Sequence, residues 1–380
     1  MDIQKLIQLL SKEEGPKLDF KLKLFTDTES SKKELSKDVC AIANSRGGRG
    51  YILFGIEDKT KRIVGINKEE FDEEQIQQIV STRTVPPVPI SVEIINFQGK
   101  DIGIITIYST EQKPHQIRDT GSFYIRRGST TDIMHKEEIA SMMQDNGLIT
   151  FELLPVAKAA IKDLSENKIK QFLLNSNLPI EINKDILSST GIITIDKESG
   201  EYHPSCGGML LFGKYPQNFL PFSLIKIHNN INFSYPQNHI SIGTIIEMLD
   251  SACEFIFDCL NEYHFPKELI QNLLAKAVIY RDYFEIYNCV EVNLNKSSIE
   301  IINPGFSTKG FGKSKDVYSK RNMWLYLKFL SIDIDKRYFN NQYNIKEYRS
   351  VKFYNILSRN LFKAVIPITK IKGINPLKAD

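Results

Sequence analysis

Two acids and a lysine near the N-terminus have the residue types that divalent-metal chemistry uses. The stretch EGPKLDFKLKL contains Glu14, Asp19 and Lys21, and the later run GYILFGIED ends in Glu57 and Asp58. Hard cations such as Mg²⁺ prefer carboxylate oxygens, and such ions activate water and relieve negative charge during phosphodiester cleavage. Asp19 and Lys21 are two positions apart, so on a strand both project from one face. A lysine there could hold a phosphate or steady a metal-bound water.

The same residues also fit an arrangement without chemistry. Asp19 and Lys21 would form an exposed ion pair worth about 0.5 kcal/mol. Glu57 and Asp58 would simply begin a turn after a strand. Spacing alone favours this plainer alternative.

A second set of residues has the types that bind phosphate. Arginine contacts phosphate through a planar, two-pronged guanidinium, and Ser and Thr hydroxyls add donors. Such contacts give affinity without reading the base sequence. Two arginines bracket Gly47-Gly48, and the run YIRRGSTT supplies the others. The predicted nucleic-acid-binding residues are Arg46, Arg49, Tyr124, Arg126, Arg127, Ser129 and Thr130, and the alternative is a solvated surface of scattered arginines.

Composition describes a soluble globular protein of ordinary kind. The chain has 380 residues, 42% of them hydrophobic and 25% charged, with a formal net charge of +3. That length predicts two or three domains, and the near-neutral charge allows nucleic-acid binding without arguing for it. The five cysteines form no CxxC pair, and no apolar run reaches the roughly 18 residues that would span a bilayer. We therefore expect a reduced, cytoplasmic protein with no membrane partner.

The elements that would position the acids alternate between helix and strand up to about residue 146. KLDFKLKLF has the period-two pattern of a strand, and SKKELSKDVCAIANS has a helical stripe that ends at Gly47-Gly48. GYILFGIED reads as a buried strand, RIVGI as a short strand and FDEEQIQQIVSTR as a helix. SVEIINF and IGIITIYS predict a hairpin. With a last strand in GSFYIRRGSTT and a helix in HKEEIASMMQ, residues 1–146 form one α+β domain.

The rest of the chain is divided by its patterns into three segments. A connecting segment over 147–264 contains a helix, the strand-like GGMLLFG and FSLIKIHN, and a long helix. A third segment over 265–344 contains the helix KELIQNLLAKAVIY and two strands. The segment 345–380 reads as a helical, basic tail with eight basic residues against two acidic ones, a net charge of +6. Interleaved aromatic residues in this tail are compatible with nucleic-acid contact or with an ordinary solvated face.

Three separated blocks resemble one known arrangement. Glu14, the triplet at 19–21, the run AIANSRGG followed by YILFGIED, and YIRRGSTT resemble the Schlafen-type AlbA-like domain. HPSCGGMLLFGKYPQNFLP is similar to the connecting segment of bacterial regulators that carry that domain. IYRDYFE followed by IEIINPGF resembles their C-terminal GHKL ATPase-like module. The resemblance implies an α+β protein: an AlbA-like α/β domain, a connecting α/β segment and a GHKL-like α/β sandwich.

The resemblance implies two kinds of function for the first domain. Bacterial relatives are described as DNA-binding transcriptional regulators or as helicase-related proteins. Eukaryotic Schlafen proteins use the domain to cleave tRNA and other RNA, with three carboxylates and a divalent metal. Here those positions are Glu14, Asp19 and Asp58, with Glu57 as the neighbouring alternative to Asp58. The second acid of the family is usually Glu, and Asp19 is one methylene shorter.

The resemblance also implies an ATP site, in degenerate form. GHKL proteins present a Glu and, four residues on, an Asn that holds Mg²⁺; the matching positions here are Asn272 and Lys276. A charged lysine cannot ligate Mg²⁺, and asparagine cannot act as a base, so we expect ATP to be absent or bound without hydrolysis. The degenerate site would comprise Asn272, Lys276, Arg281, Asp282, Asn303 and Gly305.

Two functions therefore stand side by side, and the first is favoured. In the first, the chain binds DNA or RNA as a transcriptional-regulator-type protein, and the C-terminal unit forms a homodimer or a vestigial ligand switch. In the second, the chain is a metal-dependent endoribonuclease acting in stress or phage defence. Glu14, Asp19 and Asp58 would then hold Mg²⁺ or Mn²⁺, and Lys21 would assist. A scaffold without nucleic acid is a weaker third alternative.

Overall fold

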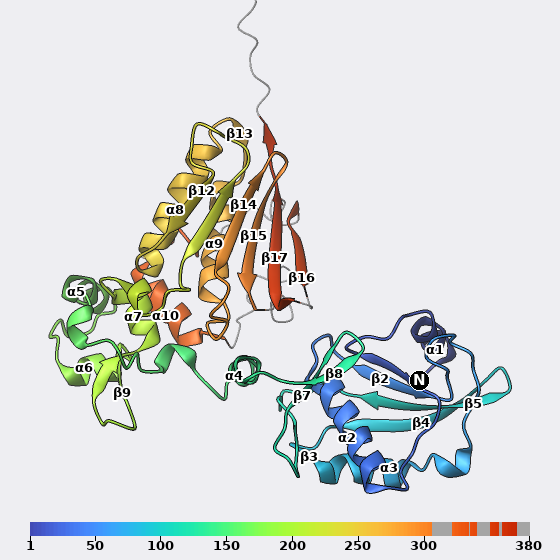
Figure 1. The fold of residues 1–380 in the computed structure, drawn as a ribbon. Helices are drawn as coiled ribbons and strands as arrows, with labels where there is room; N and C mark the ends of the chain where they lie inside the picture. Colours follow the sequence, from blue (N-terminus) through green and yellow to red (C-terminus); the bar gives the residue numbers. More distant parts are fainter. Residues whose placement is uncertain (306–320, 334, 340–349, 357–358, 371–380) are drawn as a thin grey trace, which may run out of the picture. The chain divides into compact units, whose positions relative to one another are not determined.

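The chain forms two compact units in the computed structural model (Figure 1). Unit 1 is Met1–Asn146 and ends where the first predicted domain ends; unit 2 is Gly147–Asp380. The structure describes all residues except 306–320, 334, 340–349, 357–358 and 371–380. Helices and strands occur in both units, which confirms the α+β class. Within the described residues, no helix combines the length and apolar character needed to cross a bilayer.

Unit 1 is built on a four-stranded sheet in the order β1-β2-β5-β4. β1 runs parallel to β2, and the other two neighbouring pairs are antiparallel. A parallel pair needs a crossover, and α2 supplies it as the helix between these two strands. The bounds are α1 (Ile3–Leu10), β1 (Leu18–Lys21), α2 (Glu29–Asn44), β2 (Gly50–Phe54), α3 (Glu73–Arg83), β4 (Ile90–Phe97) and β5 (Lys100–Ile107).

Apolar side chains cover both faces of this sheet. On one face, α2 and α3 pack against alternate sheet residues such as Ile52 and Ile105. On the other face, Leu6 of α1 packs with Phe20 and Leu53. The alternation along each strand therefore feeds two hydrophobic clusters, and polar side chains emerge mainly at the strand ends.

The predicted hairpin and last strand of unit 1 are both present. β4 and β5 are joined by Gln98 and Gly99, which both have positive φ angles of 55° and 76°, the conformation that a two-residue turn favours. β7 (Tyr124–Arg127) pairs with β8 (Thr130–Ile133) in a second hairpin. The prediction of a strand at RIVGI is wrong, because only Ile63 pairs there, in an isolated bridge with Ile56. The remaining elements are β3 (Thr84–Val85), β6 (Gln116–Ile117) and α4 (Lys136–Asp145).

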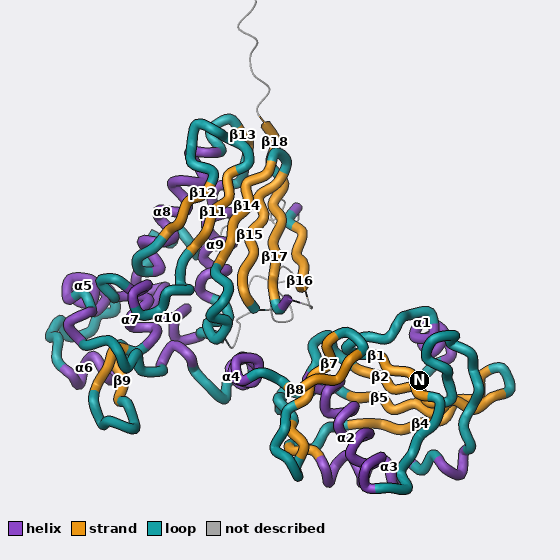
Figure 2. Tube along the Cα trace, in the orientation of Figure 1, coloured by secondary structure: helices purple, strands orange, loops and turns teal. Residues whose placement is uncertain are grey.

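Unit 2 contains a six-stranded sheet in the order β12-β11-β14-β15-β17-β16, and Figure 2 shows its strands side by side. Alternate residues of β14, such as Val290, Val292 and Leu294, are buried in one core with α8 and α9. The sheet strands are β11 (Ile225–Asn229), β12 (Asn238–Ser241), β14 (Val290–Asn295), β15 (Ser298–Pro304), β16 (Lys352–Ile356) and β17 (Leu361–Pro367). The other elements are α5 (Glu166–Asn175), α6 (Lys184–Ser189), β9 (Ile193–Ile195), β10 (Tyr202–Pro204), α7 (Cys206–Phe212), α8 (Ile245–Cys259), β13 (Tyr263–His264), α9 (Lys267–Ile279), α10 (Met323–Ile332) and β18 (Thr369–Lys370).

Strands from all three predicted segments of residues 147–380 pair in this sheet. β11, from the segment 147–264, pairs with β14, and β15, from 265–344, pairs with β17, from 345–380. The boundaries placed at 264 and 344 therefore fall inside one sheet. Backbone pairing between distant strands leaves no composition change in the sequence, which is why the pattern missed it.

The described part of the predicted basic tail is strand rather than helix. Phe362, Ala364 and Ile366 alternate inward along β17, between β15 and β16. Lys363 points the other way and pairs with Glu300 of β15 at 2.7 Å. The alternation of apolar and polar residues in this segment is typical of a strand. The prediction of a helix considered its net charge and overlooked that alternation.

The segment GGMLLFG is a helix, α7, although it reads as a strand. Ser205 caps it by accepting a hydrogen bond from Gly208 N at 2.9 Å. A Cβ at Gly207 would lie 2.3 Å from the Trp324 ring, and a Cβ at Gly208 would lie 2.1 Å from Ile192 O. The two glycines are poor helix formers that permit close packing on both sides of α7.

Candidate functional site

Asp19 lies at the centre of a buried ion-pair network in unit 1. It is on β1 and only 4% exposed. Its Oδ1 accepts a hydrogen bond from Arg126 Nη2 at 2.9 Å, and its Oδ2 lies 3.0 Å from Lys21 Nζ. Arg126 comes from β7, whose backbone is tied to the end of α2 by the hydrogen bond from Arg126 N to Ser45 Oγ. Asp19 is therefore neutralised by two cations of the protein.

Lys21 extends the network to α2. Its Nζ lies 2.8 Å from Asp38 Oδ2, and Asp38 Oδ1 also accepts a hydrogen bond from Thr131 Oγ1. Burial acts to lower the pKa of Lys21, but the charges of Asp38 and Asp19 outweigh it, so the pKa is raised. Lys21 is thus held as a cation between two carboxylates, which joins β1, α2 and the β7–β8 hairpin.

Glu14 lies next to Asp19, as the candidate site requires. Its Oε1 accepts a hydrogen bond from Phe20 N at 2.8 Å. Burial raises the pKa of Glu14, and the negative charges of Asp19 and Asp58 raise it further. The fold therefore brings the predicted acids into one electrostatic neighbourhood from separate parts of the chain.

The third acid faces solvent and is paired elsewhere. The Asp58 side chain is 53% exposed and lies 3.7 Å from Lys61 Nζ. That ammonium also sits 3.8 Å from the centre of the Phe20 ring, a cation–π contact. Glu57, the neighbouring alternative, pairs with Arg62 at 3.3 Å.

The acids do not fit a divalent metal as they are arranged. Both oxygens of Asp19 already face cations, and Asp58 lies apart in its own ion pair. In the part of the chain that the structure describes, no group of three or more His, Cys, Asp or Glu side chains is placed to hold a metal ion. The arrangement holds protein cations at the position where the resemblance implied Mg²⁺ or Mn²⁺.

Two of the predicted phosphate-binding arginines are engaged within the protein. Arg126 is buried against Asp19, so the expectation that it faces nucleic acid is wrong. Arg127 is exposed but forms a two-pronged pair with Glu138 at 2.9 and 2.8 Å and a third contact with Asp132. Local spacing cannot reveal such partners, because two of the three lie more than ten positions away.

The other predicted residues of the interface are more accessible. Ser129 and Thr130 are exposed at the tip of the β7–β8 hairpin, where Gly128 has a φ of 63°. Tyr124 is partly buried, and Lys37 Nζ lies 5.5 Å from the centre of its ring. Arg49 is exposed and stacks on Tyr108, with its guanidinium carbon 5.2 Å from the ring centre.

Four basic side chains lie at the turn between α2 and β2, and two of them were missed in the sequence. Arg46 and Arg49 lie on the turn, and Arg46 pairs with Asp145 at 3.3 Å. Lys17 Nζ donates to Ile42 O at 2.5 Å, and Lys113 Nζ donates to Ser45 O at 3.2 Å. Burial lowers the pKa of Lys17 to about 6, with a contribution from the charge of Lys113. Lys17 lies within the stretch EGPKLDFKLKL and Lys113 in a loop, and neither position by itself indicates that the side chain reaches the end of α2, so only the fold could reveal them.

The residues of the predicted ATP site are buried in unit 2. Asn272 is 1% exposed, and its Nδ2 donates to Tyr338 O at 2.8 Å. Burial lowers the pKa of Lys276 to about 8. Arg281 is sandwiched between aromatic rings, with its guanidinium carbon 4.8 Å from the Phe222 centre and 5.1 Å from the Tyr283 centre.

The remaining three positions of that site belong to the same buried region. Asp282 is fully buried, and its backbone N–H donates to Pro304 O at 2.9 Å. Asn303 is 6% exposed at the end of β15. Gly305 has a φ of 94°, and a Cβ there would lie 2.1 Å from an Arg321 nitrogen. Within the described residues, these positions lie among closely packed polar groups.

Comparison with known proteins identifies a domain in the first unit. Two solved structures are similar to the chain, one over almost its full length and one over about a third of it. They are the DIP2311 protein of Corynebacterium diphtheriae (17% identity, 98% of this chain and 81% of that chain, TM-score 0.40) and the N-terminal domain of a Nitrosomonas europaea protein described as RecG-related (20% identity, 31% of this chain and 80% of that chain, TM-score 0.24). None of the curated proteins matches the chain. Residues 14–135 match the family model described as Schlafen, AlbA_2. The N-terminal unit therefore carries a Schlafen AlbA_2 domain.

Proposed function

We propose that unit 1 binds nucleic acid through the phosphate backbone, at the turn between α2 and β2. The observation that carries this proposal is the gathering of Lys17, Arg46, Arg49 and Lys113 around residues 45–49. Among the described residues, no carboxylate pairs with Lys17. Arg46 already pairs with Asp145, and a phosphate would bring further negative charge beside Lys17 and the exposed Arg49. The match to the Schlafen AlbA_2 model over residues 14–135 agrees with this proposal.

The low pKa of Lys17 leaves this side chain largely uncharged near pH 7, because burial and, to a smaller extent, the charge of Lys113 disfavour its ammonium form. A phosphate at the turn would raise that pKa, so Lys17 would gain its charge on binding. Gly47 and Gly48 have φ angles of 115° and 85°. Because both are glycines, the tip of the turn carries no side chains. A polyanion can therefore approach the backbone closely between the two arginines.

The proposed contact reads charge and shape rather than base sequence. Its basic side chains would contact phosphate groups. Such contacts fix the position of a nucleic acid on the protein but do not read its base sequence. A transcriptional-regulator role would need base contacts from residues beyond this cluster. We therefore propose nucleic-acid binding as the activity of unit 1 and transcriptional regulation as one cellular use of it.

Fluorescence anisotropy with labelled duplex DNA, single-stranded DNA and tRNA tests the proposal. Wild-type protein should bind at least one of these, and Lys17→Met with Arg49→Ala should weaken binding about tenfold or more. Arg62→Ala is the matched control, because Arg62 is exposed and pairs with Glu57 on another loop. Equal weakening by the control would place the contact elsewhere, and no binding by the wild type would end the proposal.

Metal-dependent RNA cleavage is the second function that the resemblance implied, and the pairing of Asp19 and Asp58 with protein cations disfavours it. The test is cleavage of labelled tRNA with Mn²⁺ or with a chelator, in wild type and in Glu14→Gln. Glu14 is the better variant because loss of Asp19 would leave Arg126 buried and unpaired. Metal-dependent cutting that Glu14→Gln removes would establish the nuclease. Binding without cutting in both proteins would leave the acids a structural role.

For unit 2 we propose a role that does not include ATP hydrolysis. Asn272 has its amide group committed to Tyr338, and Lys276 replaces the residue that would hold Mg²⁺. Pure protein should show no phosphate release from ATP above a heat-treated sample. Turnover that increases with protein concentration would contradict this proposal. Light scattering of the same sample would show whether unit 2 mediates a homodimer.

A further inference from the structure

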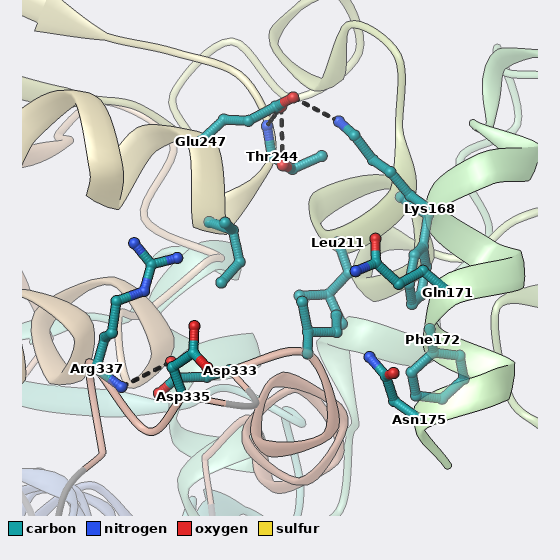
Figure 3. Close-up of a pocket in the computed structure, with 13 residues that line it drawn as sticks. Lys168, Gln171, Phe172, Asn175, Leu211, Thr244, Glu247, Asp333, Asp335 and Arg337 are labelled. Carbon is teal, nitrogen blue, oxygen red and sulfur yellow. Dashed lines mark hydrogen bonds and ion pairs between the residues drawn. The ribbon is translucent and has the colours of Figure 1, made fainter. Parts of the chain in front are cut away.

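Unit 2 contains a cavity of about 340 Å³ that the proposed nucleic-acid contact does not use (Figure 3). It lies among α5, α7, the N-terminus of α8 and the turn after α10. Its volume is at the lower end of the range typical of small-molecule sites. Its apolar lining residues are Phe172, Leu211, Phe212, Ile246 and Ile332.

One wall of the cavity contains an ion pair between two of its own lining residues, Lys168 and Glu247. Lys168 Nζ lies 2.7 Å from Glu247 Oε1. Glu247 Oε2 accepts hydrogen bonds from Thr244 N and Thr244 Oγ1, both at 2.8 Å, which closes the N-terminus of α8. Figure 3 shows this pair bridging two elements above the cavity. Lys168 keeps N–H donors beyond the one that faces Glu247.

The opposite wall is a tightly held turn after α10. Asp333 accepts hydrogen bonds from the backbone N–H groups of Arg337, Tyr338 and Phe339 at 3.0 to 3.2 Å. Arg337 Nη1 lies 3.1 Å from Asp250, and its other guanidinium N–H groups remain available. Asp335 has no ion-pair or hydrogen-bond partner among the residues that the structure describes. This turn therefore presents a carboxylate and a guanidinium two positions apart.

α5 adds two amide groups to the cavity. Lys168, Gln171 and Asn175 are three and four positions apart, so they share one helix face. Figure 3 shows Gln171 and Asn175 on the opposite side of the cavity from Arg337. Neither side-chain amide contacts a described residue through a hydrogen bond. The two amides offer both donors and acceptors to a guest.

The charged groups that line the cavity favour one kind of ligand. Lys168 and Glu247 neutralise each other, and Asp333 is held by three backbone N–H groups, so the carboxylate of Asp335 and the remaining N–H groups of Arg337 are open to a ligand. A polyanion would be repelled by Asp335, and a simple cation would leave the N–H groups of Arg337 unused. A guest that carries one charge of each sign close together meets an opposite charge at each end. The apolar lining residues of the cavity would contact the rest of the ligand.

We propose that this cavity binds a free α-amino acid with an apolar side chain. Its carboxylate would accept hydrogen bonds from Arg337, and its ammonium group would donate to Asp335. The side chain would lie on Ile246, Leu211 and Ile332. Gln171 would supply a further polar contact from α5. This site is independent of the nucleic-acid contact in unit 1.

Equilibrium dialysis of the full chain with radiolabelled L-leucine and L-phenylalanine tests the proposal. We expect saturable binding of at least one of them. Asp335→Asn should weaken it about tenfold or more, because it removes the charge that meets the ammonium group. Ile246→Trp should abolish it by filling the floor. Leucinamide and 4-methylpentanoate, which each lack one charge, should fail to compete.

Asp258→Asn is the matched control, because Asp258 is exposed near the far end of α8 and does not line the cavity. It should leave binding unchanged. An unchanged urea unfolding curve by far-UV circular dichroism in each variant would show that the protein remains folded, because Ile246→Trp adds a second tryptophan in addition to Trp324. Absence of binding by both amino acids, or binding that Ile246→Trp leaves intact in a folded variant, would overturn the proposal.

Discussion

Arg126 on β7 reaches Asp19 on β1 across 107 positions of sequence, and their charged groups meet at 2.9 Å in the interior of unit 1. Both side chains are almost completely buried. A buried ion pair is strongly destabilised when one partner is lost, because the other charge stays in a medium that solvates it poorly. The pair therefore holds the β7–β8 hairpin to the sheet edge at which the predicted acids gather.

Removal of Arg126 alone should cost unit 1 about 3–5 kcal/mol of unfolding free energy. Arg126→Met leaves Asp19 with Lys21 as its remaining cation, and Asp19→Leu combined with Arg126→Met should restore part of the loss. Urea unfolding followed by far-UV circular dichroism measures this change. The chain's single tryptophan, Trp324, lies in unit 2, so its fluorescence reports that unit separately.

The exposed neighbour Arg127 provides the control for this prediction. Its pairs with Glu138 and Asp132 face solvent, where ion pairs contribute about 0–1 kcal/mol. Arg127→Met should therefore shift the unit 1 transition only slightly. Equal effects of Arg126→Met and Arg127→Met would contradict the structural role given to the buried pair.

The local elements of unit 1 could be predicted from sequence, but the partners of its charged residues could not. Period-two and helical patterns located β1, α2 and the β4–β5 hairpin because backbone structure depends on nearby residues. The patterns gave Arg126 and Arg127 the same role, although one is buried and the other exposed. Only the tertiary fold brings Asp19 to one of them and leaves the other with Glu138.

Salt dependence should report how many phosphates the α2–β2 turn contacts. In duplex DNA, each phosphate neutralised by a protein cation contributes about 0.9 to the slope of log affinity against log salt concentration. Arg49→Ala should lower the magnitude of that slope by about one such contact. Anisotropy titrations between low and moderate salt measure it.

Arg62→Ala should leave the salt slope unchanged, because Arg62 lies outside the proposed contact. A wild-type slope near zero would mean that the observed binding is not electrostatic. In that case Lys17 and Lys113 would serve only to bind the carbonyl groups at the end of α2. The two results separate a phosphate contact from a helix-terminating role.

Gly207→Ala should destabilise unit 2 even though alanine favours helices. Alanine is about 1 kcal/mol better than glycine inside a helix. The added methyl group, however, would lie 2.3 Å from a Trp324 ring carbon and 3.0 Å from Glu152 O. Overpacking of this kind typically costs about 1–3 kcal/mol. The urea midpoint of Trp324 fluorescence should fall.

Gly207→Ala combined with Trp324→Leu should recover part of that loss, measured by circular dichroism. A midpoint for Gly207→Ala at or above that of the wild type would show that helix propensity outweighs the contact. The same contact explains why GGMLLFG was mistaken for a strand. Gly207 serves packing against a residue more than a hundred positions away.

Glu152 should make the stability of unit 2 fall as pH rises above the ordinary pKa of glutamate. The carboxylate is buried at the start of α10, where Glu152 Oε1 accepts a hydrogen bond from Trp324 N at 3.2 Å. Burial raises its pKa, and the hydrogen bonds lower it by less. The folded state therefore holds a proton that the unfolded state has already released. Stability is then highest below the ordinary pKa of glutamate and declines as pH rises through the folded-state value.

Glu152→Gln should flatten this pH dependence and keep the cap, because its amide oxygen can still accept from Trp324 N. Glu152→Ala should also flatten it, but with a loss of about 0.5–2 kcal/mol at low pH, since the cap is removed. The neighbouring Cys206 does not interfere, because burial raises its pKa to about 12. Urea midpoints of Trp324 fluorescence between pH 4 and pH 8 measure all three proteins. A decline with pH that persists in Glu152→Gln would assign the titration to another group.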